Sequence, residues 1–424
     1  MYKSKYNYIY KRENDWCFYN TLTGSVCLLD ETHKKMYDKF NFKNENEFLN
    51  DMIKNGFIRH NEYDEESIVN FSRARRCLNE NSMYLRILTT TSCNARCEYC
   101  YEKGMKKQNM TLKVAEQISK FILKQPKKEK VYIHWFGGEP LLNVKVIDRI
   151  MGDIYDHLKN NGTQVFVYFT SNGSILDKEL AKMAKQKWHA NQFQITIDDL
   201  EEKYNEIKNY INKKYDFNRV IDNIGFLLEN EISVILRINY IPSETQKVKK
   251  IIDFIYNKFE KYCDNKLLVF SPAPIFNSNL NGNLKDCASL KKLNVYNMLE
   301  PNIYLINKGL LSVEDGMDLK YKGGSCYACH QGSFVINPKG ELFKCTVAIN
   351  DSKAKVGDVY NGIDRNRTYF EWITPVLPKK CNKCKFLPIC QGGCRAGHMG
   401  YMNVACKRNV SEIKSILNYR IGTK

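Results

Sequence analysis

Three cysteines in the stretch TSCNARCEYCYEKG have the spacing of a metal-binding loop. Cys93, Cys97 and Cys100 lie four and three residues apart, with no fourth cysteine beside them. Three thiolates can bind three irons of a cubane [4Fe-4S] cluster and leave the fourth iron open to a ligand from outside the protein. Zinc is the alternative, but structural zinc loops usually offer four protein ligands. The loop therefore predicts an iron–sulfur cluster with one reactive corner.

A second group of cysteines lies near the C-terminus. Its members are Cys326, Cys329, Cys345, Cys381, Cys384, Cys390, Cys394 and Cys406. In a long chain such a string is more typical of metal binding than of disulfides, and a zinc ribbon is the alternative to iron–sulfur clusters. His330 and His398, beside these loops, are predicted to make local hydrogen bonds. The scattered cysteines are predicted to be small buried apolar residues: Cys17, Cys27, Cys77, Cys263 and Cys287.

Composition excludes several classes of protein. The chain has 424 residues, a hydrophobic fraction of 43% and a formal net charge of +18. No stretch approaches the roughly 18 apolar residues that a membrane span needs, and MYKSKYNYIYKREND lacks the apolar run of a signal peptide, so we expect a cytoplasmic protein. Lysine is spread along the chain without an arginine-rich block, which argues against nucleic acid. The charge then indicates a solvated surface or an acidic peptide partner.

The pattern of apolar residues divides the chain into three regions. Residues 1–80 combine paired strands with helical spacing and predict a small α+β, winged-helix-like module. Residues 81–310 alternate strands and helices six times, which predicts a parallel sheet curved into a partial (β/α)6 TIM-like barrel. Residues 311–424 are rich in cysteine and glycine and end in VSEIKSILNYRI, a predicted closing helix.

Polar motifs follow the predicted barrel strands at the same end. In chain order they are the three cysteines, GGEP at 137–140, SNG at 171–173, Asp198 with Asp199, and Arg237 with Asn239. Turn chemistry alone could account for GGEP or SNG. Because the carboxyl ends of barrel strands meet at one rim, their shared position predicts a single site there.

These motifs together closely resemble the radical S-adenosylmethionine (SAM) enzymes. The resemblance rests on C-x3-C-x2-C after the first barrel strand, an aromatic residue, Tyr99, before the last cysteine, and GGEP after the second strand. It implies that SAM chelates the open iron and is cleaved by one electron to a 5′-deoxyadenosyl radical, which abstracts hydrogen from a substrate. A flavodoxin or ferredoxin type of donor would supply the electron.

The resemblance also assigns contacts with SAM. Gly137 and Gly138 would let the backbone approach its methionine part, and the carboxylate of Glu139 would face its ammonium. Lys208 stands where many relatives carry an arginine for its carboxylate, and Asp199 stands where a glycine is common. The full set assigned to SAM is Tyr99, Gly137, Gly138, Glu139, Ser171, Asn172, Thr196, Lys208, Arg237 and Asn239. For Thr196, Lys208, Arg237 and Asn239 the alternative is a polar group satisfied by local backbone.

The C-terminal cysteines are similar to the SPASM extension of radical enzymes that modify peptides or proteins. By that resemblance two auxiliary [4Fe-4S] clusters are bound. One takes Cys381, Cys384, Cys390 and Cys406. The other takes Cys345 and Cys394 with the upstream pair Cys326 and Cys329, of which one could be a bystander.

The substrate class follows from two further features. Sulfatase maturases have an aspartate after the cysteine that matches Cys345, whereas this chain has Thr346. The module at residues 1–80 looks like the leader-recognition elements of peptide maturases, which add a peptide as a strand to a sheet edge. We therefore predict a maturase of a ribosomally made precursor peptide with a leader, forming a thioether, carbon–carbon or carbon–oxygen crosslink. The alternatives are oxidation without crosslinking, an iron–sulfur electron carrier and a zinc-stabilised binding protein.

Overall fold

The computed structural model describes most of the chain as two compact units. The described residues are 1–39, 46–61, 63–100, 102–275, 295–318, 326–374, 377–401 and 410–422. The barrel unit comprises Glu80–Met317 and Gly332–Phe370, and the terminal unit comprises Met1–Asn79, Asp318–Gln331 and Glu371–Lys424. Cys287 and Cys406 lie outside the described residues.

An eight-stranded sheet forms the centre of the barrel unit, in the order β11-β10-β9-β8-β7-β6-β12-β13. The strands are β6 (Ser82–Thr90), β7 (Lys130–Gly137), β8 (Gln164–Ser171), β9 (Gln192–Ile197), β10 (Ser233–Tyr240), β11 (Leu268–Pro274), β12 (Ser333–Ile336) and β13 (Leu342–Phe343). Strands β6 to β11 pair in parallel, each with the next in the chain. The predicted partial barrel of six parallel strands is confirmed.

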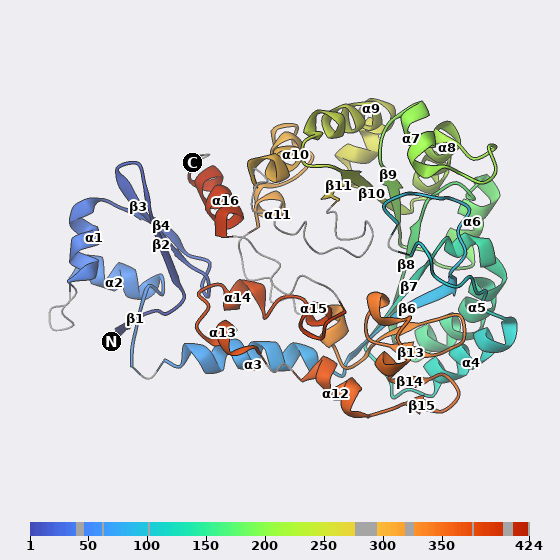
Figure 1. The fold of residues 1–424 in the computed structure, drawn as a ribbon, viewed down its shortest axis with the longest axis horizontal. Coiled ribbons are helices and arrows are strands. Elements are labelled where there is room, and N and C mark those ends of the chain that lie inside the picture. Colours follow the sequence, from blue (N-terminus) through green and yellow to red (C-terminus); the bar gives the residue numbers. More distant parts are fainter. Residues whose placement is uncertain are drawn as a thin grey trace. The chain divides into compact units, whose positions relative to one another are not determined.

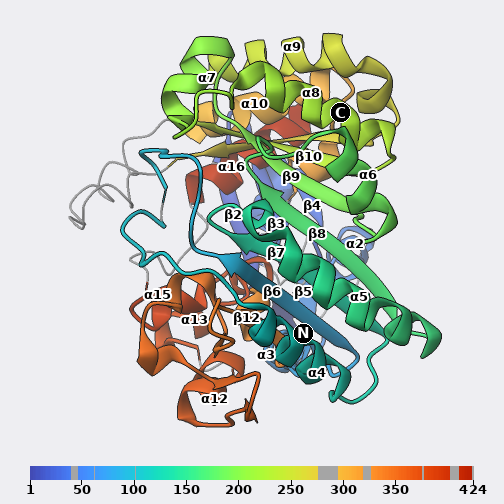
Figure 2. The same ribbon diagram turned by 90° about the vertical axis from the view of Figure 1, so that its right-hand side faces the viewer.

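Helices alternate with these strands and cover the outer face of the curved sheet (Figure 1). They are α4 (Leu112–Leu123), α5 (Val144–Asn160), α6 (Lys178–Gln186), α7 (Glu201–Lys208), α8 (Phe217–Glu229) and α9 (Thr245–Asp264). The unit also contains α10 (Val295–Asn307), α11 (Val313–Gly316), β14 (Gly357–Asp358) and β15 (Gly362–Ile363), and the chain passes into the terminal unit within α12 (Arg367–Ile373). Figure 2 shows the twist that accumulates from β6 to β10.

Alternating burial explains why this sequence forms barrel strands. On β10, Val234, Leu236 and Ile238 are fully buried, whereas the residues between them are only half buried. Successive strand residues face opposite sides of a sheet, so one set packs beneath the helices and the other lines the inner face. The polar residues of the inner face can therefore meet without entering the hydrophobic core.

Strand β12 extends the sheet beyond the six predicted strands. It pairs in parallel with β6, with Ser333 opposite Tyr84, although the two lie far apart in the chain. The stretch SFVINP, which follows Cys329, thus becomes part of the barrel sheet. Pairing at this sequence separation leaves no local signal in the sequence.

The N-terminal part of the terminal unit is a three-stranded antiparallel sheet with helices, as the residue pattern predicts. Its sheet has the order β2-β3-β4. The elements are β1 (Tyr2–Lys3), β2 (Asn7–Arg12), β3 (Asp15–Asn20), β4 (Val26–Leu29), α1 (Glu31–Asp38), α2 (Glu47–Lys54), β5 (Ile58–Arg59) and α3 (Glu65–Cys77). Phe18, Tyr37, Leu49 and Met52 form the centre of its hydrophobic core.

Helix α3 begins within the acidic stretch NEYDEES. Asp64 caps the helix by accepting a hydrogen bond from the Ser67 backbone N–H, and 13 helical residues follow. The buried residues of α3 are Glu65, Val69, Arg73 and Cys77. Since two of these four are charged, the helix lacks the apolar stripe by which an amphipathic helix is recognised.

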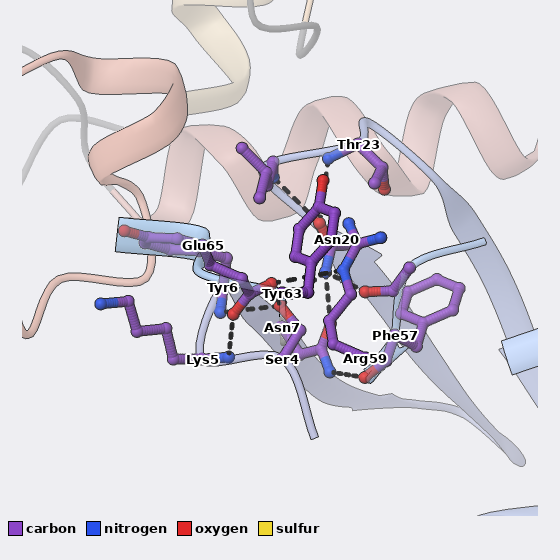
Figure 3. Close-up of polar contacts among 12 residues, drawn as sticks. Ser4, Lys5, Tyr6, Asn7, Asn20, Thr23, Phe57, Arg59, Tyr63 and Glu65 are labelled. Atoms are coloured by element: carbon purple, nitrogen blue, oxygen red, sulfur yellow. Dashed lines mark hydrogen bonds and ion pairs between the residues drawn. The ribbon is translucent and has the colours of Figure 1, made fainter. Parts of the chain in front are cut away.

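Buried polar contacts hold the start of α3 against the N-terminal strands (Figure 3). The Glu65 carboxylate accepts hydrogen bonds from the Ser4 hydroxyl at 2.5 Å and from the Lys5 backbone N–H at 3.1 Å. Arg59 Nε lies 3.5 Å from Glu65 Oε1. Asn20 Nδ2 donates to Ser4 Oγ, which connects the cluster to the end of β3. The cluster therefore determines where α3 begins.

Replacing Glu65 by alanine should destabilise the protein by about 3 kcal/mol, because Arg59 and two hydrogen-bond donors would lose a buried carboxylate. The adjacent Glu66 is a matched control. It pairs with Lys5 at 2.7 Å, but both side chains are about half exposed. Glu66→Ala should cost less than about 1 kcal/mol. Chemical unfolding of the full chain measures both, and equal losses would contradict this account.

The C-terminal part of the terminal unit consists of short helices that carry the cysteines and one longer helix. They are α13 (Lys379–Asn382), α14 (Leu387–Cys390), α15 (Arg395–His398) and α16 (Val410–Gly422). Tyr6 and Val69 pack with Cys381 and Leu387 in one hydrophobic cluster. The Tyr10 hydroxyl donates to Asn418 Oδ1 at 2.8 Å. The two ends of the chain therefore share one core.

Candidate active site

The cysteine loop leaves the end of β6 and is held by its neighbours. The backbone N–H of Ala95 lies 3.4 Å from Cys93 Sγ, and Asn172 Nδ2 lies 3.8 Å from the same sulfur. The Cys97 thiol lies 3.9 Å from the backbone oxygen of Lys208. Burial raises the pKa of Cys93 to about 12 and also raises the pKa of Cys100. These thiols are therefore protonated until a metal displaces the proton.

The GGEP loop packs directly on the cysteine loop. A Cβ at Gly137 would lie 2.1 Å from the Thr90 carbonyl oxygen, and a Cβ at Gly138 would lie 2.3 Å from that of Ser92. The backbone N–H groups of Gly138 and Glu139 donate to the same two oxygens, at 3.1 and 2.9 Å. The two glycines thus allow the GGEP loop to contact the cysteine loop. Their predicted role in admitting the methionine part of SAM stays a prediction.

Glu139 is fully buried and joins the ends of β7 and β8. Its carboxylate accepts hydrogen bonds from the Ser171 hydroxyl at 2.9 Å, from the Asn172 N–H at 2.8 Å and from the Leu141 N–H at 3.2 Å. Burial raises its pKa to about 7, although these hydrogen bonds oppose the shift. The residue therefore places SNG beside the cysteines, and its contact with a ligand ammonium stays a prediction.

A buried ion pair lies behind the loop. Lys208 Nζ is 2.7 Å from Asp198 Oδ2, and both side chains are almost fully buried. The Tyr99 hydroxyl donates to Asp198 Oδ2 at 2.8 Å and lies 3.1 Å from Lys208 Nζ. Burial alone would lower the pKa of Lys208, but the negative charge of Asp198 raises it well above its usual value. The ammonium predicted to face a ligand carboxylate is thus already paired within the protein.

Asp198 connects this pair to the fifth barrel strand. Asn239 Nδ2 donates to Asp198 Oδ1 at 2.9 Å, and Arg237 Nε donates to Asn239 Oδ1 at 2.9 Å. Asp198 was not among the predicted ligand contacts. Its position at the end of a strand was the signal, but its partners come from distant segments and are not visible in the sequence. Asp199 lies 3.7 Å from Lys247 Nζ instead.

The structure thus brings the predicted rim residues together. Residues 87–255 of the chain match the sequence model of the Radical SAM superfamily. Residues 87–255 therefore form a radical SAM domain. The match spans β6 to α9 and contains the cysteine loop, GGEP, SNG, Asp198 and Lys208.

Known radical SAM enzymes resemble the chain over most of its length. The radical SAM cyclopropyl synthase TigE of Paramaledivibacter caminithermalis is 23% identical over 99% of this chain and 97% of its own. A cysteine-type anaerobic sulfatase-maturating enzyme of Clostridium novyi is 25% identical over 72% of this chain and 86% of its own.

Two solved structures share the fold. Streptococcus suis SuiB, bound to its precursor peptide SuiA, aligns with a TM-score of 0.56 and 16% identity, covering 96% of this chain and all (100%) of that one. The enzyme anSMEcpe, with AdoMet and a Kp18Cys peptide, aligns with a TM-score of 0.61 and 19% identity, covering 80% of this chain and 98% of that one.

The radical SAM domain implies a [4Fe-4S] cluster and SAM, and the loop fits them. Cys93 has two N–H donors near its sulfur, which suits a thiolate ligand. Within the described part of the chain, no three His, Cys, Asp or Glu side chains are close enough to hold a single metal ion. A cubane binds each thiolate to a different iron, so its ligands need not meet at one atom. The three half-buried thiols of one loop satisfy that requirement.

Two of the residues assigned to SAM, Thr196 and Arg237, lie opposite each other in the β9–β10 register. The barrel sheet also holds polar residues that the sequence analysis did not name. Deeper in the barrel, Arg86 Nε donates to His134 Nδ1 at 3.4 Å, and His134 Nε2 lies 2.8 Å from Thr170 Oγ1. Burial and the charge of Arg86 lower the pKa of His134 to about 3, so this histidine is neutral.

The C-terminal cysteines fall in both units. Cys345 belongs to the barrel unit, whereas Cys326, Cys329, Cys381, Cys384, Cys390 and Cys394 belong to the terminal unit. Their loops are tight turns, with backbone hydrogen bonds from Cys384 to Cys381 and from Gly393 to Cys390, each at 3.0 Å. His398 makes a local hydrogen bond with the Gly392 carbonyl at 2.6 Å, as predicted.

Proposed function

We propose that this enzyme is a peptide maturase that crosslinks a ribosomally made precursor peptide, with a thioether as the first choice of bond. The observation that carries the proposal is similarity beyond the radical SAM domain. The match to SuiB, whose structure was solved with its precursor peptide, extends over 96% of the chain and so includes the N-terminal module. The predicted electron donor and cytoplasmic location belong to the same proposal. Among the described residues, no helix is both long and apolar enough to cross a membrane.

In this proposal the clusters and SAM carry out the radical chemistry, and the residues of the chain hold them in position. When bound, the cluster at Cys93, Cys97 and Cys100 with SAM supplies a radical that abstracts hydrogen, and the two auxiliary clusters supply an acceptor for the surplus electron. The chain orients these groups. Glu139 holds SNG against the cysteine loop, and the ion pair of Asp198 with Lys208 holds Tyr99 beside it.

Product analysis tests the proposal. If a short reading frame next to the gene encodes a peptide with a leader, that peptide is the candidate precursor, and it is incubated with reconstituted enzyme, SAM and dithionite. A crosslink removes two hydrogens from the peptide, and a thioether also consumes one cysteine thiol, so mass spectrometry after thiol alkylation separates the possibilities. If the peptide loses two hydrogens while every thiol remains reactive, the product is a crosslink other than a thioether. An unchanged peptide would contradict the proposal.

Ring formation without sulfur is a second candidate, because the relative that covers 99% of the chain is a cyclopropyl synthase. It also removes two hydrogens and leaves the thiols reactive. Formylglycine formation has less support. Thr346 stands at the position of the aspartate that sulfatase maturases carry, and a threonine hydroxyl is no base at neutral pH.

The edge strand β4 is the proposed site for the leader. Strand β4 pairs with β3 on one side, at one end of the three-stranded sheet. Val26 and Leu28 project from the same face and are 38% and 40% exposed. An added peptide strand could pair with this edge and cover both side chains. Residues 1–79 contain 13 basic and 12 acidic residues, so the module itself does not select an acidic leader.

Replacing Leu28 by aspartate should weaken binding of the leader about tenfold, which corresponds to about 1.4 kcal/mol. The charge would have to be desolvated where an apolar side chain is covered. Fluorescence anisotropy with the labelled leader half of the neighbouring precursor measures the effect. Ile211 in the barrel unit, 62% exposed, is the control. If Ile211→Asp weakens leader binding as much as Leu28→Asp does, β4 is not the binding site of the leader.

A further inference from the structure

The segment of the terminal unit that contains α13 and α14 packs by one side on the N-terminal module. Tyr6 forms a hydrophobic cluster with Cys381 and Leu387. The ring of Phe386 lies against that of Tyr8 on β2, with the ring centroids 5.1 Å apart. Cys381 and Leu387 are almost fully buried, at 9% and 3% exposed. One side of the segment is therefore held against the module.

Four lysines occupy the exposed side of this segment. They are Lys379, Lys380, Lys383 and Lys385. Two of them directly precede Cys381, and the other two stand on either side of Cys384. All four side chains are exposed to solvent, and within the ranges that the structure describes none of them pairs with an acidic side chain. Positive charge thus borders two cysteines that are predicted to bind an auxiliary cluster.

The basic excess of the chain is concentrated in this part of the sequence. Residues 371–424 contain 10 basic and 2 acidic residues, whereas residues 1–79 contain 13 and 12. Lysines that serve only solubility need no particular position, but these four border predicted cluster ligands. A positive patch attracts an acidic protein and raises its rate of association at low salt. The charge therefore indicates an acidic partner, and the location indicates one that exchanges electrons.

We propose that these four lysines, here called the lysine patch, form the docking surface for an acidic electron-carrier protein of the flavodoxin type. The inference rests on the proposed function, in which a crosslink removes two hydrogens from the peptide. One leaves as a hydrogen atom to the deoxyadenosyl radical, and the other leaves as a proton to solvent and an electron. The oxidised carrier takes up that electron beside Cys381 and Cys384 and is reduced by one electron. Electron-transfer partners need only a small and weak interface, for which complementary charge is well suited.

The test measures binding of an oxidised, acidic flavodoxin to the full chain, which is reconstituted with iron and sulfide without oxygen. A dye on the flavodoxin reports binding through fluorescence anisotropy, and iron analysis of each variant checks that its clusters assemble. Charge is reversed at three lysines of the patch: Lys379→Glu, Lys380→Glu and Lys383→Glu. The matched control changes the net charge of the chain equally at three exposed lysines in or next to α6: Lys178→Glu, Lys182→Glu and Lys187→Glu.

We expect the patch variant to bind flavodoxin about tenfold more weakly than the intact chain, and the α6 control to bind about as tightly as the intact chain. Raising the salt concentration from about 50 to 200 mM should weaken binding to the intact chain, because salt screens exposed charges, and should change the residual binding of the patch variant little. If the patch variant does not assemble its clusters, Lys379→Gln with Lys380→Gln removes two charges without reversing them and should weaken binding about threefold.

Equal weakening by the two triple substitutions would overturn the proposal, because net charge and not the lysine patch would then attract flavodoxin. Absence of binding to the intact chain at low salt would overturn it as well. Displacement of flavodoxin by the unlabelled leader peptide would show that the patch binds the precursor instead. The binding assay contains neither SAM nor precursor, and product analysis with dithionite contains no carrier, so this inference and the proposed function can fail independently.

Discussion

Replacing Cys97 by alanine should abolish the formation of 5′-deoxyadenosine from SAM in the presence of dithionite. Cys97 is the middle cysteine of the loop, and its thiol lies 3.9 Å from the Lys208 carbonyl. Without it the cluster has two protein ligands and no fixed position for its open iron. Loss of a residue that only orients a metal ligand costs roughly 10- to 100-fold. Loss of the ligand itself should exceed that range.

Two measurements separate loss of the cluster from loss of the fold. The intact protein should bind about 12 irons as three cubanes, and the Cys97→Ala variant about 8. Cys263→Ala, a buried cysteine on α9, should keep both the iron and the activity. Undiminished 5′-deoxyadenosine from Cys97→Ala would show that this loop does not bind the catalytic cluster. Bound zinc and a colourless protein would show that the chain binds no iron–sulfur cluster.

Replacing Lys208 by methionine should destabilise the iron-free protein by about 3–5 kcal/mol. The substitution leaves the Asp198 carboxylate buried without its cation, 2.7 Å from where Nζ lay. Tyr99 would also lose one of its two polar contacts. Chemical unfolding followed by tryptophan fluorescence reports on this region, since Trp135 and Trp188 are fully buried in the barrel unit.

The same helix provides the control. Lys203 on α7 pairs with Glu206 at 2.7 Å, but both side chains are 65% exposed. Lys203→Met should therefore cost less than about 1 kcal/mol. Adding Asp198→Asn to Lys208→Met should recover part of the loss, because the uncompensated charge is then gone. Equal costs for Lys203→Met and Lys208→Met would show that the buried pair contributes no more than an exposed one.

The barrel was predictable because its signal is local. Strand β8, for example, is the β-branched and aromatic stretch QVFVYFTS at Gln164–Ser171. Apolar periodicity of two or of 3.6 residues follows from the backbone geometry of each element, so a short window suffices. Helix α3 shows the limit of that signal. Its buried face holds Glu65 and Arg73, and the partners of Glu65 are supplied by other segments.

By itself, the sequence determined the cysteine loop, because the spacing of Cys93, Cys97 and Cys100 is a property of one short segment. It also determined which strand ends carry polar residues. Only the tertiary structure decided what those residues contact. Asp198 meets Lys208 and Tyr99 from two other segments, and the Cys77 carbonyl accepts a hydrogen bond from the distant Gln331 N–H. Such pairs are set by packing between distant segments, which the spacing of residues along the chain does not encode.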